Sequence, residues 1–121
     1  MANPNIVNVT SILGKVAGQA VTTSPTAIVS NAAASGTIVK INSLIVSNID
    51  GTNAADITAY VYKGDAATAY YLAYTISVPA DATLVVISKD TSIYLEENDS
   101  IYLQASVNLD LSAVCSYEII S

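Results

Sequence analysis

The chain has 121 residues, of which 52% are hydrophobic and 12% are charged, and its four lysines and ten acidic residues give a net charge of −6. This length fits one domain with a single core, and the apolar content excludes a disordered chain. Four scattered lysines and no arginine exclude a nucleic-acid-binding surface and disfavour an anionic membrane.

The N-terminal stretch, residues 1–13, is predicted to be an arm or an edge strand, followed by a single β-sandwich domain over residues 14–121. Residues 5–13 alternate imperfectly between apolar and polar side chains, and Gly14 and Gly18 follow. An arm that pairs with a neighbouring subunit and an ordinary edge strand both fit this pattern. The first residues lack the basic and apolar parts of a signal peptide, so we expect synthesis in the cytoplasm.

The longest β-type run spans residues 37–49 and ends at Asp50 and Gly51, which favour a turn. A short strand over residues 27–30 and a loop over residues 31–36 precede it. We predict that the run is a central strand with one packed face. Strict alternation places Val39, Ile41, Ser43 and Ile45 on one face, and Lys40, Asn42, Leu44 and Val46 on the other.

The remaining strands are separated by short turn signals. We predict strands over residues 56–63, 70–78 and 83–88, with a hairpin joining the last two. A short repeat, Ser-Ile-Tyr-Leu, then marks two strands on either side of an acidic turn, at residues 92–95 and 100–103. The final strand, residues 109–120, alternates most cleanly, so its register is strongly specified.

Eight or nine short strands without a convincing helix indicate an all-β fold. Parallel sheets need long crossover connections, for which the chain has no room, so we predict an antiparallel β-sandwich. A jelly-roll-like topology fits best, and an immunoglobulin-like Greek-key sandwich is the alternative.

Catalytic groups are scarce. The chain contains no histidine, the usual general base at neutral pH, so we predict that it is not an enzyme and has no cofactor. Cys115 cannot form an internal disulfide, and its place in the apolar face of the last strand indicates a buried structural thiol.

Acidic residues gather at two predicted turns. Glu96, Glu97 and Asp99 share one turn, and Asp50 and Asp56 flank another. Oxygen-rich turns can hold Ca²⁺, but neither matches the twelve-residue calcium loop, and exposed turns often contain acids without a ligand. We therefore predict no metal site.

Three tyrosines are the candidate binding residues. Alternation places Tyr60 and Tyr62 on the face opposite Ile57, and Tyr102 on the face opposite Ile101. Tyrosine buries an apolar ring while keeping a polar tip, which favours a contact surface for another protein. Cross-strand aromatic packing on a solvated sheet, or an opposite choice of core face, explains the same pattern.

Three segments resemble small virion structural proteins of tailed phages, especially those that infect cyanobacteria. They are residues 2–12 (Ala-Asn-Pro-Asn-Ile-Val-Asn-Val-Thr-Ser-Ile), residues 40–51 (Lys-Ile-Asn-Ser-Leu-Ile-Val-Ser-Asn-Ile-Asp-Gly) and residues 114–118 (Val-Cys-Ser-Tyr-Glu). The likeness covers most of the chain and carries no catalytic signature.

The resemblance implies a structural role in the virion, for a protein made in the host cytoplasm, and it does not decide the position in the particle. We expect a capsid decoration, or cement, protein that binds the major capsid protein or other virion proteins and bridges capsomers as a homo-oligomer, with a trimer favoured. A neck, tail or fibre component is one alternative, and a carbohydrate- or receptor-binding module is another. The residues expected to touch neighbouring proteins are Ile6, Val7, Val9, Tyr60, Tyr62 and Tyr102.

Overall fold

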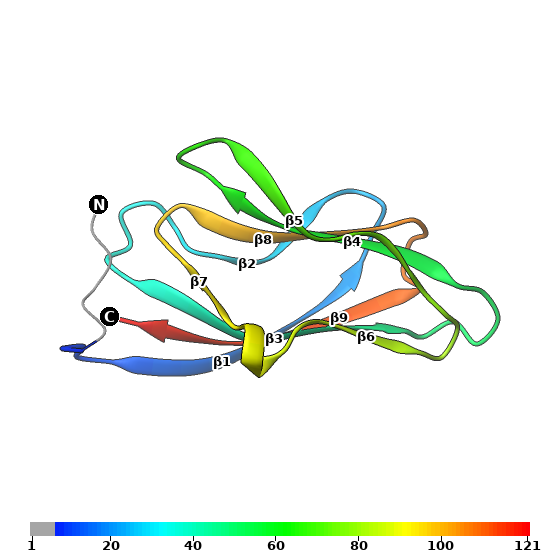
Figure 1. Cartoon of the computed structure of the whole chain (residues 1–121), viewed down its shortest axis with the longest axis horizontal. Helices are drawn as coiled ribbons and strands as arrows, with labels where there is room; N and C mark the ends of the chain where they lie inside the picture. The colour runs from blue at the N-terminus through cyan, green and yellow to red at the C-terminus, as the bar shows by residue number, and fades with distance from the viewer. Residues whose placement is uncertain (1–6) are drawn as a thin grey trace.

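The computed structural model describes residues 7–121, which form two antiparallel β-sheets packed face to face (Figure 1). The predicted β-sandwich is confirmed. Among the described residues there is one three-residue 3₁₀ helix, and no helix is long and apolar enough to span a membrane. The elements are β1 (Ile12–Val21), β2 (Thr26–Ser30), β3 (Ile38–Asn48), β4 (Ala55–Lys63), β5 (Thr68–Val78), β6 (Thr83–Ile87), η1 (Lys89–Thr91), β7 (Ile93–Leu95), β8 (Asp99–Ala105) and β9 (Leu111–Ile120).

The strand order defines a jelly roll. One sheet has the order β1-β9-β3-β6, with β7 also paired to β3, and the other has the order β2-β8-β4-β5. Early strands therefore pair with late ones in a nested series, in which β1 pairs with β9, β2 with β8, β3 with β6 and β7, and β4 with β5. This nesting is the jelly-roll topology rather than the immunoglobulin one.

The predicted central strand is confirmed as β3, which lies between β9 on one side and β6 and β7 on the other. The prediction of which β3 residues share a face was wrong beyond Ile41. A β-bulge between Ile41 and Ser43 inserts one residue into the pairing with β9, which shifts the alternation by one. Leu44 and Val46 are therefore buried, and Ile45 is only partly so.

The core lies between the two sheets and is built from aliphatic side chains. Figure 1 shows the layers that supply it, with β2, β4, β5 and β8 above and β1, β3, β6 and β9 below. The largest apolar side chains with less than 2% exposure are Ile41, Leu44, Ile57, Ile87, Leu95, Ile101, Leu103, Leu111, Val21, Val46 and Val78.

The hairpin predicted between residues 70–78 and 83–88 was wrong. β5 pairs with β4, whereas β6 pairs with β3 in the other sheet. Residues 79–82 carry the chain between the layers, and residues 64–67 make the hairpin turn of β4 and β5. The Ser-Ile-Tyr-Leu repeat does mark two short strands around an acidic turn, although β7 and β8 belong to different sheets.

The first strand begins later and runs further than residues 5–13. β1 starts at Ile12 and continues through Gly14 and Gly18, where an added Cβ would meet no close neighbour. Before it, the backbone N–H groups of Thr10 and Ser11 donate to the Ser121 carbonyl at 2.7 and 3.0 Å. The domain boundary after residue 13 stays a prediction.

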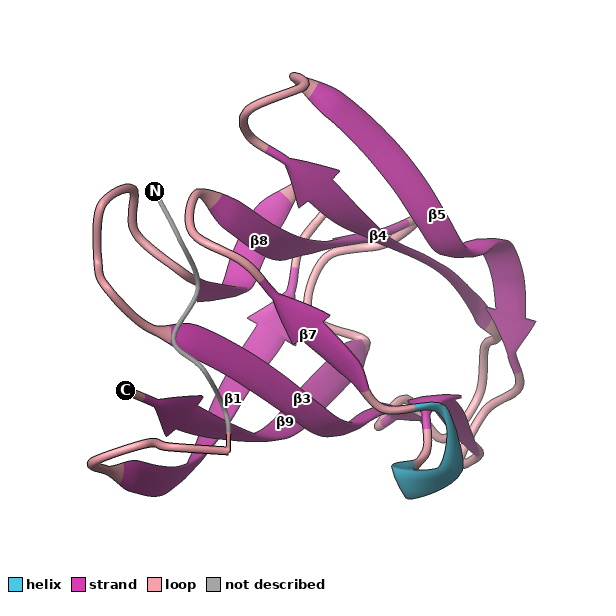
Figure 2. Ribbon diagram, turned by 60° about the vertical axis from the view of Figure 1, so that its left-hand side comes forward, coloured by secondary structure: helices cyan, strands magenta, loops and turns pink. Residues whose placement is uncertain are grey.

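β5 forms the outer edge of the four-stranded sheet, and Figure 2 shows it curving away from the rest of the sandwich. Most of its side chains are exposed, including both apolar and aromatic ones. This edge carries part of the candidate site.

Candidate functional site

The three predicted tyrosines lie together on the outer face of the four-stranded sheet. On β4, Ile57 and Ala59 point into the core, so Tyr60 and Tyr62 point outward. The pairing of β4 with β8 places Tyr102 opposite Tyr60. Local alternation along two strands is enough to predict this grouping.

β5 adds two tyrosines that the sequence analysis missed. Tyr71 lies opposite Tyr60 in the pairing of β4 with β5, and its ring contacts that of Tyr74. Two register shifts in this pairing put extra residues into β5, so simple alternation does not reveal that the side chains of residues 71 and 74 meet. The only sequence signal was the density of tyrosine over residues 70–74.

These five side chains form a continuous tyrosine row across β8, β4 and β5. Its members in spatial order are Tyr62, Tyr102, Tyr60, Tyr71 and Tyr74. Their successive ring centroids are 5.9, 5.4, 5.3 and 5.0 Å apart, distances typical of favourable aromatic pairs.

The interior of the tyrosine row and its Tyr74 end differ in ring geometry. The rings of Tyr60 and Tyr102 are parallel to within 3° with their centroids 5.4 Å apart, which is an offset stack. Desolvation by burial, followed by the neighbouring tyrosines, raises the pKa of Tyr60. Tyr71 and Tyr74 are 56% and 63% exposed, and their rings meet edge to face.

None of the five hydroxyl groups makes a hydrogen bond to another described residue. Each phenol can both donate and accept. The tyrosine row therefore combines an ordered aromatic surface with unused hydrogen-bonding capacity, a combination that suits contact with another molecule.

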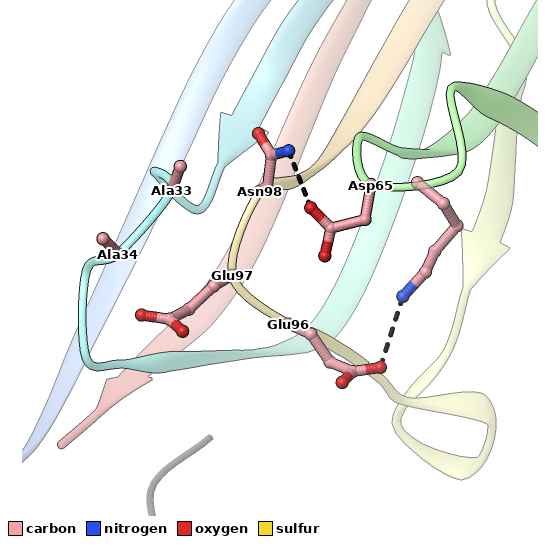
Figure 3. Close-up of a pocket in the computed structure, with 7 residues that line it drawn as sticks. Ala33, Ala34, Asp65, Glu96, Glu97 and Asn98 are labelled. Atoms are coloured by element: carbon pink, nitrogen blue, oxygen red, sulfur yellow. Dashed lines mark hydrogen bonds and ion pairs between the residues drawn. The ribbon is translucent and has the colours of Figure 1, made fainter. Parts of the chain in front are cut away.

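A second candidate was the acidic turn between β7 and β8, which borders a hollow (Figure 3). Lys63 Nζ lies 2.7 Å from Asp99 Oδ2 and 3.2 Å from Glu96 Oε1. The hydrogen bond to Asp99 is the main cause of the raised pKa of Lys63. Glu97 accepts a hydrogen bond from the Gly36 backbone.

The carboxylates of this turn thus stabilise the junction of three loops. In Figure 3, Asn98 also binds Asp65 across the hollow. Within residues 7–121, no three acidic, cysteine or histidine side chains are grouped so as to hold a metal ion. At the other predicted turn, Asp50 accepts a hydrogen bond from the Thr52 N–H, which lowers its pKa.

Cys115 is a buried thiol, as predicted. It has 0% exposure within the core, and desolvation raises its pKa from 9.0 to about 11. The nucleophilic thiolate is therefore scarce at neutral pH.

The predicted arm residues do not join the tyrosine row. Val7 and Val9 precede β1, which belongs to the opposite sheet, and Ile6 lies outside the described residues. β1 itself exposes three large apolar side chains, Ile12, Leu13 and Val16, which the sequence analysis did not select. The molecule thus carries two separate candidate contact surfaces.

No family model matches the chain, and no curated protein matches its sequence. Among solved structures, it resembles a subunit of Bacillus endospore appendages, described as disulfide-linked pili, with a TM-score of 0.50 and 12% identity over 99% of this chain and 95% of that one. This likeness is one of fold.

Two weaker matches are viral. A pentameric capsid protein isolated from metagenomic phage sequences gives a TM-score of 0.41 and 16% identity, over 84% of this chain and 63% of that one. The structure of infectious bursal disease virus, Gx strain, gives a TM-score of 0.33 and 10% identity, over 93% of this chain and 40% of that one.

Proposed function

We propose that this chain is a non-enzymatic virion structural protein of a tailed phage, which decorates the outer capsid shell and bridges adjacent capsomers. The tyrosine row is the observation that carries the proposal. It is a continuous aromatic surface with free hydroxyl groups on a sheet whose other face is packed into the core.

The geometry of the tyrosine row suits a protein partner. Tyr62, Tyr102 and Tyr60 already contact one another, so they lose little side-chain freedom when a partner covers them. Tyrosine rings supply apolar area and their hydroxyl groups supply hydrogen bonds, and such side chains dominate the energetics of many interfaces.

A bridging role needs two surfaces that face different neighbours. The tyrosine row lies on the four-stranded sheet, whereas the segment from Val7 to Val16 lies on and before β1 of the other sheet. Among the described strands, β1 pairs only with β9, so its other edge is open to a strand from a neighbouring chain. One subunit can therefore contact the shell and a second copy of itself, and we favour a trimer.

Assembly of this chain relies on non-covalent contacts. Its one cysteine, Cys115, is buried, so the disulfide linkage described for the spore appendage has no counterpart. Many copies with weak individual contacts on one particle produce strong overall attachment.

A neck, tail or fibre component is the alternative structural role. The same two surfaces would then close a ring of subunits instead of covering a shell. The number of copies per particle separates the two roles, as argued in the Discussion.

The replacement of Tyr60 and Tyr62 by serine tests the contact surface. We expect the doubly substituted chain to fold, because neither ring is in the core, and to lose binding to capsids that lack the protein. Occupancy is measured by co-sedimentation with such capsids. Tyr94→Ser is the matched control, since Tyr94 is an exposed tyrosine on the other sheet and its loss should leave occupancy unchanged.

A folded Tyr60→Ser, Tyr62→Ser chain that still occupies the shell as the unmodified chain does would contradict this assignment. Circular dichroism and thermal melting establish whether each variant is folded.

A further inference from the structure

A hollow of about 280 Å³ lies at the Tyr74 end of the tyrosine row. Its volume lies just below the range of about 300–1,000 Å³ that is usual for small-molecule pockets, so only a ligand of about one ring is considered. The hollow is bounded by β4, β5, β8 and the turn after β8. Its lining residues are Asp56, Thr58, Tyr71, Tyr74, Thr75, Gln104, Ala105 and Ser106.

Tyr74 supplies the hollow with an exposed aromatic ring. It is the last member of the tyrosine row, contacts Tyr71 edge to face at 5.0 Å, and is 63% exposed. Tyr62, at the other end of the row, is only partly exposed and does not line the hollow. Tyr74 does line it and is well exposed, so a flat ligand held in the hollow can stack on Tyr74.

The polar groups of the hollow are held in place with hydrogen-bonding capacity left over. The Asp56 side chain makes no hydrogen bond or ion pair with another described residue, while its backbone N–H donates to Ser106 Oγ at 2.9 Å. Gln104 Nε2 donates to the Thr23 carbonyl at 3.0 Å, which leaves Oε1 as an acceptor. Thr58 Oγ1 accepts from the Thr75 N–H, which leaves its hydroxyl proton as a donor.

This set of groups is complementary to a polyol. Hydroxyl groups satisfy both the acceptors at Asp56 and Gln104 and the donor at Thr58, and a sugar ring presents C–H groups that pack on an aromatic face. A purely apolar ligand would bury the Asp56 carboxylate without a partner, which is costly. We propose that this hollow binds one ring of a neutral saccharide, stacked on Tyr74 and hydrogen-bonded to Asp56.

The negative charge at the hollow favours neutral over anionic sugars. The hollow has no lysine in its lining, its one charged group is Asp56, and the chain carries a net charge of −6. Anionic sugars are therefore repelled, whereas neutral hexoses and N-acetylhexosamines are accepted.

Saturation-transfer NMR with the full chain tests the proposal. The probes are oligosaccharides of glucose, galactose, mannose and N-acetylglucosamine, with sialylated and uronic-acid oligosaccharides as the anionic arm. We expect at least one neutral series to bind, with the strongest saturation on the C–H protons of one sugar face. Failure of every neutral series, or a preference for the anionic ones, overturns the proposal.

Variants locate the site by titration with the bound probe. Tyr74→Ala and Asp56→Ala should each weaken affinity by roughly tenfold or more, because each removes a principal contact. Tyr74→Phe should bind almost as well as the unmodified chain, since it keeps the ring, and it serves as the second variant if Tyr74→Ala does not fold. Binding that is unchanged in Asp56→Ala and in Tyr74→Ala, or that is lost equally in the control Tyr94→Ala, overturns the assignment.

This proposal does not rest on the shell-decoration role. The sugar titration uses the isolated chain and residues at the Tyr74 end, whereas the capsid assay uses Tyr60 and Tyr62. Each result can therefore fail without the other.

Discussion

The buried side chain of Asn48 stabilises one of the connections that carry the chain between the sheets. Asn48, at the end of β3, is 3% exposed, and its Nδ2 donates to the carbonyls of Asn53 and Val78 at 3.0 and 2.9 Å. Its Oδ1 accepts from the Asp50 N–H at 2.8 Å. The side chain is thus fully satisfied, and it ties the start of the β3–β4 connection to the end of β5.

Cys115 gives the stability of the fold a pH dependence. Its folded pKa of about 11 lies above the ordinary value of 9.0, so the folded state keeps a proton that the unfolded state loses. The stabilisation is fully present below about pH 9 and is lost as the pH rises to about 11, at a total cost of about 2–3 kcal/mol.

The comparison of Cys115→Ala with the unmodified chain isolates this effect. The free energy of unfolding, measured with urea at a series of pH values, should fall more steeply above about pH 9 in the unmodified chain. All other ionisable groups are the same in both chains, so their contribution cancels. A stability difference that stays constant across the alkaline range would argue against a thiol buried in the core.

At the scale of the element, β3 shows how one extra residue changes which side chains build the core. The bulge after Ile41 buries Leu44 at 0% exposure and leaves Ile45 partly exposed. Leu44→Ala should therefore cost about 2–5 kcal/mol of unfolding free energy, and Ile45→Ala about 1 kcal/mol. Urea unfolding of the two variants measures both values, and an equal or reversed order would mean that β3 has no bulge.

Strands could be located from the sequence because their signals are local. The β-branched residues of 37–49 and the alternation of 109–120 correspond to β3 and β9. Which strands pair with each other could not be predicted in the same way. The Pro79 turn looks like a hairpin turn in sequence, yet it joins β5 of one sheet to β6 of the other, since strand partners are set by long-range packing.

The same distinction between local signals and long-range pairing explains which residues of the candidate site could be predicted. Tyr60, Tyr62 and Tyr102 follow from alternation on β4 and β8, whereas Tyr71 and Tyr74 depend on register shifts that no local pattern encodes. The full length of β1 could not be predicted, because it contains Gly14 and Gly18 and glycine is rare within strands. Polar groups of the hollow come from three parts of the chain and meet only in the fold.

At the scale of the whole molecule, the jelly roll places the two candidate contact surfaces on different sheets. The tyrosine row occupies the outer face of one sheet, and β1, which has no second strand partner within residues 7–121, lies at the edge of the other with exposed apolar side chains. Few charges and a net charge of −6 allow dense packing against neutral or basic partners. This arrangement is the one that the proposed bridging role requires.

The most direct test of the central claim is the copy number of the chain in purified phage particles, measured by quantitative mass spectrometry against the major capsid protein. Shell decoration predicts on the order of hundreds of copies per particle, in a fixed ratio to the capsid protein. A number that fits only a single ring would place the chain in the neck, tail or fibre. Absence from the particle would contradict a virion role altogether.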